Sequence, residues 1–164
     1  MLSRVRAAGA SKPIVQPETA LSASPPAYAA YAAAQPYFDL VRGALGDLVH
    51  GAHFFDAVAD DIAYEVLYDF PGWPRLVRGR EALMAQFAGY AANMTLSAAD
   101  HLVVHRAEGG VVVLEYEVHG TVAATGARYD NRFASILTVS GRRIVRWRDY
   151  MDSLAAWNTI TGGR

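Results

Sequence analysis

Apolar residues recur every three or four positions after Pro36, as Phe38, Val41, Leu45 and Leu48. This spacing is typical of an amphipathic helix, and a proline is well suited to a helix's first turn. Gly46 weakens the predicted helix and Gly51 is expected to end it. The segment therefore predicts one long helix that buries a single face.

The next part of the chain predicts further elements separated by loop residues. We expect a short helix over 53–59, a strand over 62–68 and a second long helix over 80–93. Between the last two, Phe70-Pro71-Gly72-Trp73-Pro74 must form a loop, because two prolines around a glycine break regular structure.

From residue 96 onward, apolar and polar residues alternate, and Gly-containing turns interrupt the alternation. The pattern predicts four strands, over 96–105, 111–123, 128–139 and 142–151. A last helix over about 153–159 follows, with Asp152 as its N-cap. The order predicts an α+β domain whose helices cover one face of a largely antiparallel sheet.

Residues 1–35 differ in composition from the rest, because they are rich in alanine, proline and serine. Such a segment is a poor helix former and has little to bury, so we expect an extension that is mobile or draped over the domain. The folded domain is then expected to span 36–160.

Composition narrows the classes of function. Hydrophobic residues make up 52% of the chain and charged residues 19%, which is typical of a globular protein. A formal net charge of -1 gives no general attraction for nucleic acid or an anionic membrane surface. The chain has no cysteine, and no apolar run reaches the roughly 18 residues of a membrane span. A cytoplasmic location is the default expectation.

Several C-terminal motifs carry a family resemblance: Val113–Gly120, Tyr129–Phe133 and Gly141–Asp152. Two upstream motifs agree with them, Phe54–Asp61 and Gly79–Leu83. Together they resemble the SnoaL-like branch of the nuclear transport factor 2-like superfamily over residues 37–158. Polyketide cyclases, ketosteroid isomerases, limonene epoxide hydrolases and phenazine biosynthesis A/B proteins belong to this superfamily.

The resemblance implies a cone: a curved mixed or antiparallel sheet wrapped around the N-terminal helices, with a deep pocket at its open end. It also implies a homodimer. The expected function is that of an isomerase, cyclase or dehydratase that acts on a hydrophobic, oxygenated small molecule. No cofactor is expected, since no Gly-rich phosphate-binding loop is present. The fold also hosts non-catalytic binding proteins and dimeric interaction proteins, which stand as alternatives.

The strand over 111–122 presents two faces of different character. One face carries Glu115, Glu117 and His119, and the other carries Leu114, Tyr116 and Val118. Taken alone, the alternation is compatible with the apolar face in the core and equally with the polar face in a pocket.

The resemblance favours the polar face in the pocket. Glu117 and Asp149 match the two carboxylates of the limonene epoxide hydrolases, but Glu115 replaces the intervening arginine, which argues against epoxide hydrolysis. Glu115, His119 and Gly120 instead match a Glu-x-x-x-His-Gly pattern of the phenazine A/B proteins. We expect Glu115, Glu117 and Asp149 to converge as acid–base groups, with the opposite, apolar face packed on a second subunit.

Other residues are weaker candidates. Asp69 precedes Phe70-Pro71, near where ketosteroid isomerases place their general base, so it is a fourth candidate catalytic residue. Substrate contacts are expected from His119, Tyr129, Trp147 and Tyr64. No metal site is expected, because His50, His53, His101 and His105 lack a recognisable ligand spacing.

Overall fold

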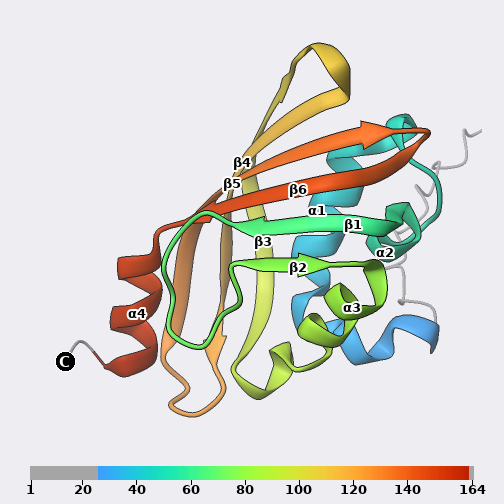
Figure 1. Cartoon of the computed structure of the whole chain (residues 1–164). Coiled ribbons are helices and arrows are strands. Elements are labelled where there is room, and N and C mark those ends of the chain that lie inside the picture. Colours follow the sequence, from blue (N-terminus) through green and yellow to red (C-terminus); the bar gives the residue numbers. More distant parts are fainter. Residues whose placement is uncertain (1–25, 163–164) are drawn as a thin grey trace, which may run out of the picture.

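Residues 26–162 are the part of the chain that the computed structural model describes, and alternating apolar residues form six strands within them. These are β1 (Val58–Val66), β2 (Leu76–Arg78), β3 (Met94–Arg106), β4 (Val111–Val122), β5 (Arg128–Ser140) and β6 (Arg143–Met151). The helices are α1 (Gln35–Leu45), α2 (Phe54–Ala57), α3 (Arg80–Ala88) and α4 (Ser153–Thr161), with 3-10 helices η1 (Pro26–Ala34), η2 (Gly46–Leu48), η3 (Tyr90–Ala92) and η4 (Glu108–Gly110) (Figure 1).

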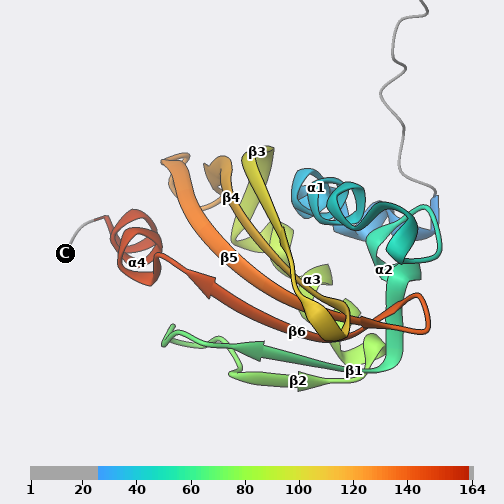
Figure 2. The same ribbon diagram turned by 90° about the horizontal axis from the view of Figure 1, so that it is seen from above.

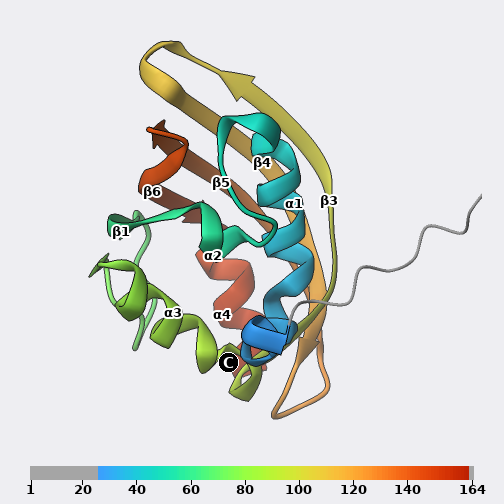
Figure 3. The same cartoon turned by 90° about the vertical axis from the view of Figure 1, so that its right-hand side faces the viewer.

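The six strands form one sheet in the order β2-β1-β6-β5-β4-β3. Strands β1 and β6 are parallel, whereas all other neighbours are antiparallel, so the sheet is mixed. The sheet is strongly curved, and α1, α2 and α3 lie on its concave side (Figures 2 and 3). This arrangement confirms the predicted α+β cone.

The predicted elements are largely present, with corrections at their ends. Helix α1 stops at Leu45, because Gly46 adopts a positive φ of 50° there. The first strand begins at Val58 rather than at residue 62. Val58 already pairs with Ile144 of β6, and an irregular stretch separates this pair from the regular pairing that starts at Ala63. Strand β2 was not predicted, because three residues are too short to show an alternating pattern.

One face of α1 fills the concave side of the sheet. Phe38, Val41 and Leu45 are fully buried, as their helical spacing predicts. Each such side chain contributes roughly 1.5–3 kcal/mol relative to an exposed position. The core therefore holds α1 at one end of the concave side.

Helix η1 also belongs to the folded body. Tyr31 is buried in the core, and Tyr28 stacks on His53 with ring centroids 3.9 Å apart and donates a hydrogen bond to Asp56. Residues 26–34, placed in the predicted extension, thus drape over the domain. The other residues of that extension, 1–25, lie outside the described part of the chain.

None of the helices within residues 26–162 is both long enough and apolar enough to cross a membrane.

Candidate active site

A cavity of about 470 Å³ opens between the concave side of the sheet, the loop 70–74 and helix α4. Its wall is mostly aromatic and aliphatic, with Tyr37 from α1, Tyr64 from β1, Trp73 from the loop and Trp157 from α4. Asp149, on β6, is the one carboxyl group among the described residues that line it. Such a cavity has the size and character of a small-molecule site.

Asp149 is 3% exposed, and burial raises the pKa of its carboxyl group to about 7. Two hydrogen bonds to Oδ1 partly oppose this rise by stabilising the charged form. Trp147 Nε1 donates over 3.1 Å, and the Ser135 hydroxyl donates across the β5–β6 pair. Both forms of the carboxyl group are therefore populated near neutral pH.

The hydrogen bonds also fix which oxygen exchanges protons. Ser135 has one hydroxyl hydrogen, so when it donates to Asp149 the Tyr116 hydroxyl, 2.8 Å away, must donate to Ser135. Oδ1 accepts from two donors, whereas no described residue donates to Oδ2. Among the described residues, Oδ2 is therefore the oxygen of ionised Asp149 that is left to accept a proton.

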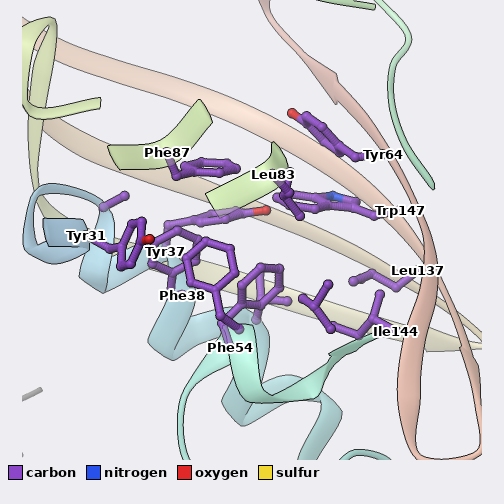
Figure 4. Packing of buried hydrophobic residues seen from close by; sticks show 14 of the residues in the cluster. Tyr31, Tyr37, Phe38, Phe54, Tyr64, Leu83, Phe87, Leu137, Ile144 and Trp147 are labelled. Atoms are coloured by element: carbon purple, nitrogen blue, oxygen red, sulfur yellow. The ribbon is translucent and has the colours of Figure 1, made fainter. Parts of the chain in front are cut away.

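Trp147 stands behind the cavity wall and supports it. Its side chain is fully buried and lies between Tyr64, at 4.3 Å between ring centroids, and Phe87, at 5.9 Å and nearly parallel (Figure 4). The structure thus places Tyr64 at the wall and Trp147 beneath it. Tyr129 also lines the cavity, and its hydroxyl accepts a hydrogen bond from Asn131 over 2.8 Å.

Two polar atoms at the wall, the Tyr37 hydroxyl and Trp73 Nε1, are buried and make no close hydrogen bond with the described residues. Tyr116 lies near the first of them and Tyr64 near the second. A buried donor without a partner costs about 1–3 kcal/mol.

The predicted convergence of Glu115 and Glu117 with Asp149 is wrong. Strand β4 turns Leu114, Tyr116 and Val118 inward, where they are buried in the core and against the cavity. Glu115, Glu117 and His119 therefore lie on the outer face of the sheet. Burial of three apolar side chains outweighs any advantage of placing three titratable groups in the core. The inward stripe is also not available to a second subunit.

Asp69 lies outside the cavity. Its side chain is 91% exposed and forms an ion pair with Arg75. It nevertheless precedes the loop 70–74, whose Phe70 and Trp73 line the cavity, so this candidate lies beside the cavity but not in its wall.

Ser135 was not among the predicted site residues, and the strand register explains why. Ser140 pairs with Arg143 next to the β5–β6 turn. If the two strands continued from there in regular register, Ser135 would pair with Arg148. A register shift at Thr138 moves Ser135 opposite Asp149 instead. No signal in the sequence marks that shift, and Tyr37 and Trp73 were likewise read only as helix and loop residues.

A mixed, unclosed cone with helices on its concave side is the nuclear transport factor 2-like fold. The chain belongs to the SnoaL-like domain family, since that family's model matches residues 41–147. This confirms the resemblance seen in the C-terminal motifs.

Similarity to individual proteins supports the assignment to this family. The protein YesE of Bacillus subtilis is 28% identical over 104 residues, which cover 63% of this chain and 71% of YesE. A crystal structure of a proposed isomerase from Bacillus subtilis superposes with a TM-score of 0.64 at 23% identity, covering 82% of this chain and 88% of that one. A phenazine biosynthesis-related protein from Pseudomonas aeruginosa gives a TM-score of 0.60 at 15% identity, covering 81% and 85%. At these identities the structures share the fold.

Proposed function

We propose that the protein is an acid–base enzyme that acts on a hydrophobic, oxygen-bearing small molecule, with Asp149 as the proton-transferring group. The observation that carries this proposal is the buried Asp149 carboxyl group in an otherwise apolar cavity, with its pKa raised to about 7. A general acid or base is most effective when its pKa lies near the working pH. An ordinary structural aspartate gains nothing from such a position, because its burial destabilises the fold.

The geometry supports proton transfer through Oδ2. Ionised Asp149 takes a proton from the carbon between a ligand carbonyl and a C=C bond, which leaves a dienolate, and the neutral acid returns that proton to the far carbon of the dienolate, so that the C=C bond moves. The net result is an isomerisation, and an enolate formed in the same way can attack a second carbonyl in a cyclisation. Ser135 and Trp147 hold Oδ1 throughout, so the carboxyl plane keeps its orientation. Tyr37 and Trp73 are the candidate donors for the enolate oxygen.

Similar proteins support a reaction of this kind. Solved structures with this fold include proposed isomerases and polyketide cyclases, and the proposed isomerase from Bacillus subtilis matches 82% of the present chain. Proton transfer next to a carbonyl group is a reaction that one buried carboxyl group can perform, and either an isomerisation or a cyclisation can proceed through it.

Exchange of α-protons tests the proposal directly. With 2-tetralone, a bicyclic apolar ketone, in deuterated buffer, the protein is expected to accelerate loss of the α-proton signal in NMR spectra. The rate should rise with pH and level off above about 7, because the ionised form is the base. Asp149→Asn should lower the rate by about 100-fold or more, whereas Asp69→Asn and Glu117→Gln should leave it unchanged.

A non-catalytic binding protein is the second candidate, and the mostly apolar wall of the cavity favours it. Saturable binding of 2-tetralone, followed by tryptophan fluorescence, without accelerated exchange would point to this function. If the Asp149→Asn variant exchanges protons as fast as the unmodified protein, the acid–base proposal is wrong whatever the affinity.

A further inference from the structure

A second polar cluster lies on the outer face of the sheet, across β4 from the cavity. It consists of Asp100 and His101 on β3 and of Glu117 and His119 on β4. Each side chain offers one carboxylate oxygen or ring nitrogen, and these four atoms all lie within 4.8 Å of one another. The cluster is separate from the proposed proton-transfer site.

A bulge in β3 builds the cluster. Asp100 pairs with Glu117 and Val103 pairs with Glu115, so β3 has one more residue than β4 between these pairs. His101 lies in this bulge with φ of 51°, a left-handed conformation that few residues other than glycine adopt. Regular alternation would turn His101 away from Asp100, but the bulge brings its Nδ1 to 3.0 Å from Asp100 Oδ1 and 3.5 Å from Glu117 Oε2.

His119 is oriented as metal-binding histidines usually are. Its Nδ1 lies 2.6 Å from Asp130 Oδ1, and Asp130 is in turn held by Arg128 at 2.6 Å. In the metal-free chain Nε2 lies 3.0 Å from Asp100 Oδ1 and donates a hydrogen bond to it. A metal ion would replace the Nε2 proton, while the Nδ1 proton stays hydrogen-bonded to Asp130. A carboxylate that fixes the distal nitrogen of a histidine is a common outer-shell feature of zinc sites.

The spacing of the ligand atoms fits a small tetrahedral ion. Zinc bonds of 2.0–2.2 Å to nitrogen and oxygen place neighbouring ligand atoms about 3.3–3.6 Å apart. The contacts of Asp100 with both imidazoles, and of Glu117 with His101, span 3.0 to 3.5 Å. The other three distances among the four ligand atoms lie within 4.8 Å, so binding an ion would draw those atoms together by up to about 1.2 Å. Arg132, which lies 3.2 Å from Glu117, is the cation that opposes binding.

We propose that Asp100, His101, Glu117 and His119 bind a divalent transition metal ion of the zinc class, one per chain. The two carboxylates supply charge and the two imidazoles supply selectivity over magnesium and calcium. The ion links β3 to β4 at the bulge, so its binding stabilises this hairpin. The absence of a recognisable histidine spacing in the sequence is explained by the bulge, which only the strand pairing reveals.

Calorimetric titration of the full-length, tag-free chain with Zn²⁺ tests the proposal. One ion per chain is expected, and Co²⁺ is expected to give the visible absorption of a tetrahedral complex. Replacing either histidine should weaken binding by more than tenfold, with His101→Asn used because asparagine tolerates a left-handed backbone. Asp130→Asn should weaken binding by about tenfold through loss of the outer-shell contact.

His105→Ala is the matched control. His105 also lies on β3 and contacts a glutamate of β4, Glu115, at 3.0 Å, but it is outside the cluster. Its replacement should leave Zn²⁺ affinity unchanged. The proposal is overturned if Zn²⁺ binding is not saturable, if His101→Asn and His119→Ala bind as tightly as the unmodified chain, or if His105→Ala weakens binding equally. Circular dichroism confirms that each variant is folded.

Discussion

Replacement of Asp149 by asparagine is expected to stabilise the fold at alkaline pH and to change its stability little under acidic conditions. Asparagine has the shape of the neutral carboxyl group, and its oxygen can still accept from Ser135 and Trp147. The variant therefore imitates the protonated form at every pH. Only the cost of ionising a buried carboxyl group is removed.

The magnitude follows from the raised pKa. The carboxyl group has a pKa of about 7 in the folded chain against 3.8 when it is free. Because the folded state binds this proton more tightly, stability is highest below 3.8, falls as pH rises from 3.8 to about 7, and is constant above that. At 1.36 kcal/mol for each tenfold change, the full loss is roughly 4 kcal/mol. Near pH 4 it is less than about 1 kcal/mol.

Urea denaturation followed by circular dichroism measures this effect. The quantity compared is the gain in free energy of unfolding from Asp149→Asn relative to the unmodified chain. This gain should be roughly 4 kcal/mol larger at about pH 8 than at about pH 4. Any effect of the amide on stability that does not depend on pH cancels when the two pH values are compared. The contributions of the other titrating groups cancel when the two proteins are compared.

Asp69→Asn is the control, since this carboxylate is exposed and its replacement should alter stability by no more than about 0.5 kcal/mol at either pH. If the gain from Asp149→Asn is the same at both pH values, Asp149 is not a buried group of raised pKa. The acid–base proposal would then lose its basis.

Three further predictions test the surroundings of the site. Ser135→Ala removes a hydrogen bond that lowers the pKa of Asp149, so the pKa should rise further, as a carboxyl ¹³C NMR titration would show. Leu114→Ala should destabilise the fold by about 2–5 kcal/mol and Glu115→Ala by less than about 0.5 kcal/mol in thermal unfolding; equal effects would contradict the assignment of the faces of β4. Gly120→Ala places a Cβ 2.3 Å from the Thr95 carbonyl oxygen and should lower stability by about 1–3 kcal/mol, whereas Gly43→Ala meets nothing within 4 Å and should raise it by about 0.5–1 kcal/mol.

Much of the fold could be predicted because its signals are local. The helical stripe of α1, the four alternating strands of the C-terminal half and the N-cap at Asp152 each depend on residues close together in the chain. The end of α1 was predicted wrongly because it depends on the backbone conformation of a glycine. The short strand β2 was not predicted because it depends on pairing with β1 at the sheet edge.

The site could be predicted only in part, because alternation defines two faces of a strand without saying which is inside. In β4 the polar face was expected inside, yet the core takes Leu114, Tyr116 and Val118, since burying apolar surface is favourable and burying two carboxylates is costly. Asp149 was predicted from its motif as a catalytic carboxylate, and the structure places it in the cavity wall, but its raised pKa required knowledge of the apolar side chains around it.

The sequence by itself determined the fold class, the family and the loop that borders the cavity, because local periodicity and motifs encode them. The tertiary structure decided which side chains meet. An extra residue in β6 shifts its register with β5 and brings Asp149 to Ser135, and a bulge in β3 brings His101 to Asp100. Both depend on how one strand pairs with another, and a single extra residue in a strand changes every contact beyond it.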